Sequence, residues 1–66
     1  MDSLKRVFSS DKVHHITIIR ELLAEEGIES YVLDQKGSAF LLGEMHVYVS
    51  DKDYDKAKQI VDNHPL

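Results

Sequence analysis

Cysteine is absent from this sequence of 66 residues, which excludes a disulfide framework and any metal site built from thiolates. A chain of this length buries only about 60% of the surface that its unfolded form exposes, so its core is thin. Because disulfide cross-links and thiolate metal sites are missing, we expect a homo-oligomer in which a second copy of the chain buries additional apolar surface. The composition, 42% hydrophobic and 30% charged, is typical of a single globular domain spanning residues 1–66.

Positive charge is also in short supply. The chain has 8 lysine and arginine residues against 12 aspartate and glutamate residues, which gives a net charge of -4. Non-specific affinity for nucleic acid comes mainly from basic residues that displace counterions, so we expect no nucleic acid partner. Apolar runs such as AFLL are far too short to span a bilayer, and the opening MDSLKRVFSS lacks an apolar signal segment. We therefore expect no membrane partner and a cytoplasmic location.

Sequence motifs that would indicate an enzyme are missing too. The chain has no nucleophile elbow, no P-loop and no paired-glycine dinucleotide turn. Ser9 and Ser10 precede a predicted helix, where serine is usually a cap rather than a nucleophile. A chain this small could hardly enclose a water-free pocket by itself. We predict a non-catalytic protein without catalytic residues or a cofactor.

The residues that are present form a regular succession of strand and helix patterns. Residues 4–9, LKRVFS, are typical of a first strand. From Asp11 the apolar residues recur every three or four positions, which predicts a helix that ends near Glu26. Its buried face would consist of Val13, Ile16, Ile19 and Leu23. Ser10 or Asp11 is the expected N-cap of this helix.

Gly27 marks the join between this helix and a second strand. A helix that ends in a left-handed residue favours glycine, which has no Cβ penalty there, and Ile28 can then fold back onto the last turn. Two strands follow, at residues 28–33 and 45–49, and both alternate in side-chain direction. A long hairpin loop, residues 34–44, joins them.

The last element is a helix that begins at Ser50. The sequence SDKD has the form of a capping box with Asp53 at its third position, and acidic residues near a helix start complement the helix dipole. The helix would end within residues 63–65. Its buried face would consist of Tyr54, Ala57, Ile60 and Val61.

The predicted order of elements is strand, helix, strand, strand, helix. This order indicates an α+β fold, in which a three-stranded antiparallel sheet carries both helices on one face. Such a layout is ferredoxin-like but lacks the fourth strand. In the full layout that strand pairs beside the first one, so we expect the first strand to be an open edge available to a partner.

Several of these motifs together resemble those of a known family. The helix stop L-x-x-x-G-I is formed here by Leu23, Gly27 and Ile28. The start of the last helix, V-x-V-x-x-x-D-x-x-x-A, is formed by Val47, Val49, Asp53 and Ala57. Over nearly its whole length the chain resembles the small bacterial domain of unknown function described as a "putative prokaryotic signal-transducing protein". The resemblance implies a βαββα fold and a signalling role by analogy with PII-type regulators, and it implies no catalytic residue.

Two segments could be read as metal ligands, and neither fits. His14 and His15 are adjacent, so on a helix their side chains point about 100° apart and do not converge on one ion. The segment DKDYDK at residues 51–56 has the alternate aspartates of a calcium loop. Lys56 and Asp62, however, stand where such a loop needs glycine and glutamate. We predict no metal site and interpret the aspartates as helix-start residues.

The second face of the predicted sheet is the strongest candidate for function. If Val32, Val47 and Val49 face the helices, no predicted element covers the opposite side. That side would present Phe8, Tyr31, Leu33, His46 and Tyr48, and the loop residues Phe40, Leu41 and Leu42 would extend it. A patch of this kind usually marks a contact surface, although amphipathic tyrosines also occur partly exposed.

Two hypotheses about function follow. The first is a small regulatory or protein-interaction domain that forms a homodimer, or binds another protein, through the open face or the edge of its sheet. The second is a sensor of a small metabolite, in the manner of PII or amino-acid-binding regulatory domains. Its ligand would lie between subunits near Gly37 and Gly43, in the 34–44 loop.

Overall fold

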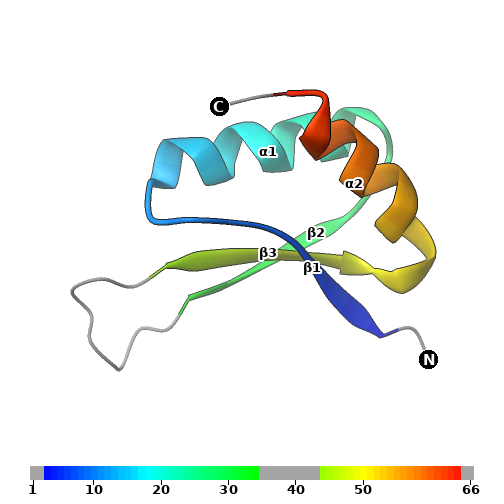
Figure 1. Ribbon diagram of the computed structural model, residues 1–66, viewed down its shortest axis with the longest axis horizontal. Coiled ribbons are helices and arrows are strands. Elements are labelled where there is room, and N and C mark those ends of the chain that lie inside the picture. Colours follow the sequence, from blue (N-terminus) through cyan, green and yellow to red (C-terminus); the bar gives the residue numbers. More distant parts are fainter. Residues whose placement is uncertain (1–2, 35–43, 65–66) are drawn as a thin grey trace.

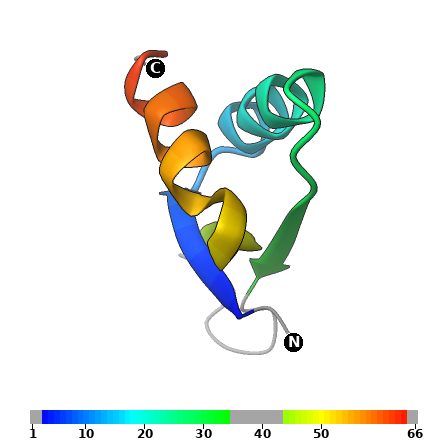
Figure 2. The same cartoon turned by 90° about the vertical axis from the view of Figure 1, so that its right-hand side faces the viewer.

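In the computed structural model, which describes residues 3–34 and 44–64, the chain folds into strands and helices in the order β-α-β-β-α. The strands are β1 (Leu4–Ser10), β2 (Ser30–Asp34) and β3 (Met45–Ser50). The helices are α1 (Val13–Glu25) and α2 (Tyr54–Asp62), and a 3₁₀ turn, η2 (Asp51–Asp53), leads into α2. Both helices lie on the same side of the sheet (Figure 1, Figure 2). The predicted α+β fold is confirmed.

The described strands form an antiparallel sheet in the order β1-β3-β2, with β3 in the centre. This is the strand order of a ferredoxin-like sheet without its fourth strand. As predicted, β1 stands at an edge, and β2 forms the other edge. A β-bulge interrupts the pairing of β1 with β3, since Arg6 lies opposite Tyr48 but Phe8 lies opposite Val47.

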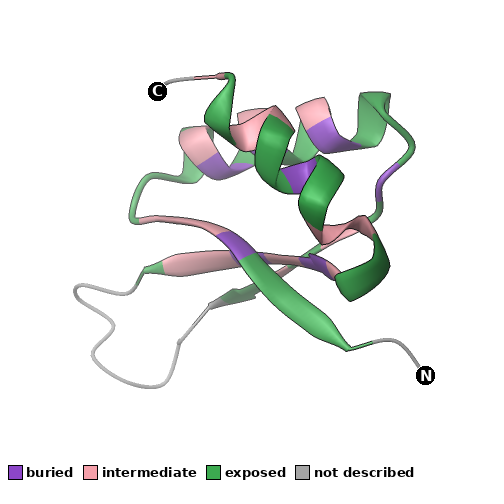
Figure 3. Cartoon of the chain, turned by 45° about the vertical axis from the view of Figure 1, so that its right-hand side comes forward, coloured by how far each residue is buried: buried purple, intermediate pink, exposed green. Residues whose placement is uncertain are grey.

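The hydrophobic core lies between the sheet and the two helices, where the buried segments face one another (Figure 3). The fully or nearly fully buried side chains are Val7, Ile16, Ile19, Leu23, Ile28, Val47, Val49 and Ala57. Val13 was predicted on the same face of α1 but is 65% exposed. The helix begins at Val13 itself, so this side chain stands at the N-terminus of α1 and does not reach the buried layer.

The start of α1 differs in detail from the prediction. Its N-cap residue is Lys12, whose side chain makes no capping hydrogen bond. Ser10 Oγ accepts a hydrogen bond from the Lys12 N–H at 3.0 Å. The predicted cap at Ser10 or Asp11 was therefore wrong, because Ser10 stabilises the turn that precedes the helix.

The end of α1 has the predicted form. Gly27 adopts a φ of +78°, in the left-handed region. Its N–H donates to the carbonyl of Ala24 at 3.0 Å, and the Ile28 N–H donates to the carbonyl of Leu23 at 2.9 Å. This pair of hydrogen bonds is the Schellman motif. Ile28 and Leu23 are buried in the same core, which confirms that Ile28 folds back onto the helix.

The start of α2 departs from the predicted capping box. Ser50 Oγ accepts the Lys52 N–H at 3.4 Å and so caps the 3₁₀ turn rather than α2. Asp53 is the N-cap residue of α2, but its side chain makes no capping hydrogen bond. The difference arises because residues 51–53 wind as a 3₁₀ turn, whose tighter geometry brings a nearer amide to the serine hydroxyl.

Candidate functional site

The face of the sheet opposite the helices consists of side chains that alternate with core residues. Register places Tyr31 opposite Tyr48, and Leu33 opposite His46, and such partners share one face of a sheet. Because Val47 and Val49 are buried against the helices, their neighbours His46 and Tyr48 point the other way. The structure therefore brings Tyr31, Leu33, His46 and Tyr48 onto one face.

Phe8 does not belong to this face, so its predicted place was wrong. It lies opposite Val47 and packs against the hydrophobic core. The β-bulge is the reason, because the extra residue Val7 breaks the alternation of β1. As a result Ser9 lies opposite His46, although uninterrupted alternation from Arg6 would place Ser9 on the other face of the sheet.

Strand β1 adds two side chains that the sequence pattern did not single out. Leu4 lies opposite Ser50, and Arg6 lies opposite Tyr48. Tyr48 is thus flanked by Arg6 on one side and Tyr31 on the other. We call the resulting surface the open face; its members are Leu4, Arg6, Tyr31, Leu33, His46 and Tyr48. Of these, Leu4 is 48%, Tyr31 43% and Leu33 51% exposed.

Contacts within the sheet orient the side chains at the centre of the open face. Ser9 Oγ and His46 Nδ1 are joined by a hydrogen bond of 2.8 Å, whose donor depends on the imidazole tautomer. The rings of His46 and Tyr48 meet edge to face, with centroids 6.4 Å apart. Both residues are half-buried. These two contacts connect His46 to β1 and to Tyr48 at the centre of the face.

At the β2 edge, Tyr31 is paired with an acidic neighbour. The Tyr31 hydroxyl donates to Glu29 Oε1 at 3.1 Å. This hydrogen bond, together with the negative charge of Glu29, raises the pKa of Tyr31 above its ordinary value of 10.0.

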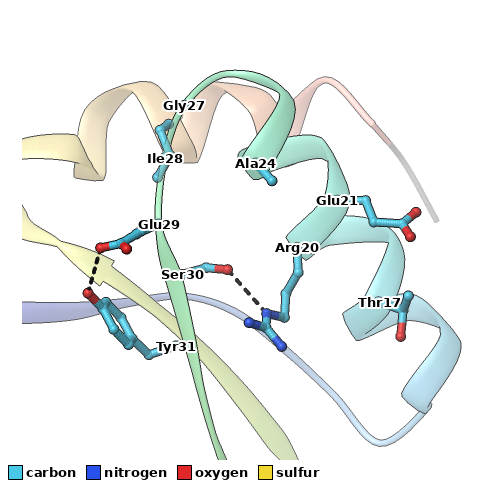
Figure 4. A pocket seen from close by; sticks show the side chains of 9 residues that line it. All are labelled: Thr17, Arg20, Glu21, Ala24, Gly27, Ile28, Glu29, Ser30 and Tyr31. Atoms are coloured by element: carbon cyan, nitrogen blue, oxygen red, sulfur yellow. Dashed lines mark hydrogen bonds between the residues drawn. The ribbon is translucent and has the colours of Figure 1, made fainter.

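A groove of about 650 Å³ lies between α1 and β2 (Figure 4). It is lined by Thr17, Arg20, Glu21 and Ala24 from α1, and by residues 27–31 from the helix-to-strand join and β2. Arg20 Nε donates to Ser30 Oγ at 3.3 Å and so connects the two walls. The sequence pattern did not predict this groove, because only the fold brings the outer side of α1 beside the edge of β2.

The other residues singled out from the sequence are the two adjacent histidines of α1 and the residues of the 34–44 loop. His14 is exposed and His15 is half-buried, and their rings meet edge to face at a centroid distance of 4.4 Å. Within residues 3–34 and 44–64, no group of three or more histidine, aspartate or glutamate side chains could hold a metal ion. Phe40, Leu41 and Leu42, and also Gly37 and Gly43, lie outside the described residues.

No helix in the described part of the chain is long and apolar enough to cross a membrane.

The strand order and the sheet with helices on one face define a small α+β domain of ferredoxin-like type, in which the described residues form three of the four strands. Across residues 4–64 the chain matches the model of one protein family, described as "Putative prokaryotic signal transducing protein". The chain belongs to this family, as its motifs predicted, and the family's description suggests a role in signal transduction. No curated protein and no solved structure matches the chain significantly.

Proposed function

We propose that this protein is a small, non-catalytic regulatory domain of signal transduction, and that it forms a homodimer through the open face. The observation that carries the proposal is the exposure of Leu4, Tyr31 and Leu33 around the half-buried Tyr48. Among the described residues, no helix or strand covers this side of the sheet. Contiguous apolar surface of this kind usually marks a site of protein contact.

The composition of the open face favours a second copy of the same chain as the partner. Aromatic side chains lie at its centre, while Arg6 is its single member with a permanent charge. Interface centres have this composition, rich in tyrosine and poor in charged residues. A two-fold dimer also requires a surface that complements itself, and a face without strong charge of one sign meets that requirement.

Association through the face is favoured over pairing of β1 edges. The bulge at Val7 bends this edge strand and interrupts its regular register. Lys5 and Arg6 are exposed beside it, and charged residues on an edge discourage pairing with another strand. The open face carries neither obstacle at its centre, where Tyr31 and Tyr48 lie opposite each other.

The alternative function, a PII-like sensor with its ligand between subunits, depends on the 34–44 loop. Residues 35–43 of that loop lie outside the described part of the chain, so this alternative stays a prediction. The cytoplasmic location expected from the sequence stays a prediction as well.

Tyr48→Glu tests the proposed dimer directly. The substitution would remove the Tyr48 ring and bury one carboxylate per subunit, beside Arg6, at the centre of the contact, so we expect the dimer dissociation constant to rise roughly 100-fold or more. The measurement is sedimentation equilibrium over a concentration series, with circular dichroism to show that the subunit stays folded.

Val13→Glu is the matched control, because it also replaces an apolar residue by glutamate. Val13 is exposed at the start of α1, and α1 lies on the side of the sheet opposite the open face (Figure 1). The control should leave both the dimer and the fold unchanged. A wild-type protein that stays monomeric at about 100 μM, or a folded Tyr48→Glu variant with unchanged dimerisation, would show that the open face is not a homodimer interface.

A further inference from the structure

The groove between α1 and β2 shares only Tyr31 with the open face and belongs to one chain. We infer that this groove binds a carboxylate group, with Arg20 as the residue that holds it. The carboxylate would come from a small organic acid or from the C-terminus of a peptide. The groove's volume of about 650 Å³ lies within the range of known small-molecule sites.

The orientation of Arg20 is the first argument for this site. Its Nε donates to Ser30 Oγ at 3.3 Å, which ties the guanidinium across the groove (Figure 4). In the described part of the chain, this is the one hydrogen bond or ion pair that the guanidinium makes. The two terminal nitrogens keep their four N–H donors for a ligand. A pair of parallel donors from these nitrogens matches the two oxygens of a carboxylate.

The placement of the acidic side chains is the second argument. Glu21 and Glu29 also line the groove, but neither is directed at the guanidinium. Glu29 accepts the hydrogen bond from the Tyr31 hydroxyl at 3.1 Å, and the Glu21 carboxylate points away from Ser30 (Figure 4). Arg20 therefore supplies the single positive charge among the residues that line the groove. One guanidinium balances one negative charge, which favours a monocarboxylate over a doubly charged phosphate.

The surroundings of Arg20 suit an acid with an apolar body. The exposed Ala24 contributes apolar surface to the groove, and Gly27 leaves room, since nothing lies within 4 Å of the position that its Cβ would occupy. Thr17 stands nearly one helical turn before Arg20 and offers a hydroxyl. Along the other wall, β2 is an edge strand, where an extended peptide could lie.

The test is a titration of the isotopically labelled full chain, followed by NMR through its amide shifts and the Arg20 Nε–H. The probes are sodium benzoate and a tetrapeptide of apolar residues with either a free or an amidated C-terminus. We expect at least one free acid to produce saturable shifts at residues 27–31, with a dissociation constant of about 10 mM or tighter. The amidated peptide should bind at least tenfold more weakly than the free peptide if the peptide binds.

Variants decide whether Arg20 holds the carboxylate. Arg20→Gln should weaken carboxylate binding at least tenfold. The affinity of Arg20→Lys should lie between those of Arg20→Gln and the wild type, because lysine keeps the charge but lacks the planar pair of donors. The matched control is Lys58→Gln, which removes one positive charge from α2 outside the groove, where Lys58 pairs with Asp62 at 3.4 Å. The control should bind like the wild type.

Each outcome of the titration has a defined meaning. Binding of benzoate alone identifies a free small acid as the source, and tighter binding of the free peptide identifies a chain terminus. Absence of saturable shifts with every probe overturns the inference. Equal affinity in Arg20→Gln and wild type, or an equal loss in Lys58→Gln, also overturns it. The site does not require the dimer, so Tyr48→Glu should bind the same probes with unchanged affinity.

Discussion

Gly27→Ala is the substitution whose effect on stability follows most directly from the structure. Gly27 has a φ of +78°, which an L residue with a Cβ adopts only with strain. An ideal Cβ at this position would meet no heavy atom within 4 Å, so steric clash with the rest of the protein contributes nothing. The expected loss is therefore the backbone strain alone.

The magnitude follows from two opposing terms. Placing a residue with a Cβ in the left-handed region costs roughly 1–2 kcal/mol. Alanine restricts the unfolded chain more than glycine does, which offsets part of this strain. The free energy of unfolding should fall by about 1 kcal/mol, and the melting temperature by about 4–8 °C for a domain of this size. Gly27→Asn should lose about half as much, because asparagine tolerates this conformation better.

Urea unfolding followed by circular dichroism measures these differences. Glu26→Ala is the matched control, since Glu26 precedes Gly27 but has an ordinary φ of -96°. Its exposed ion pair with Lys56 spans 3.8 Å and contributes little, so we expect a change within about 0.5 kcal/mol. Two results would refute the reasoning: a Gly27→Ala protein as stable as the wild type, or one that loses more than about 3 kcal/mol.

The remaining predictions concern the core and the β2 edge. Leu23→Ala removes a side chain that is 0% exposed and should lower the free energy of unfolding, measured in urea, by about 2–5 kcal/mol. Val13→Ala, at an exposed site, is the control and should change this free energy by less than about 0.5 kcal/mol. A loss below about 1 kcal/mol for Leu23→Ala would contradict the described core. Glu29→Gln should lower the pKa of Tyr31 toward 10.0, as followed by ¹³C NMR of the tyrosine ring. Because folding raises this pKa, the stabilisation is complete below pH 10 and disappears as the pH rises through the higher folded pKa. An unchanged Tyr31 titration in Glu29→Gln would exclude Glu29 as the cause.

The candidate site shows how far alternation along a strand can be trusted. Tyr31, Leu33, His46 and Tyr48 could be assigned to one face because β2 and β3 alternate without interruption. Phe8 was assigned to the same face by the same reasoning and lies on the other. The bulge that reverses it depends on how β1 pairs with β3, about forty residues away in the chain. Local spacing in β1 carries no sign of that pairing.

The sequence by itself determined the features that depend on neighbouring residues: the order of the elements, the helix stop at Gly27, and the apolar faces of both helices. These features are local because backbone conformation and helix periodicity act over a few residues. Tertiary structure alone decided on which face of the sheet Phe8 lies and why Val13 is exposed at the start of α1. It also decided the groove in which Arg20 contacts Ser30. Each of these depends on where α1 and β1 lie relative to the rest of the sheet. That placement follows from packing between segments distant in the chain, where burial of the whole core outweighs local preference.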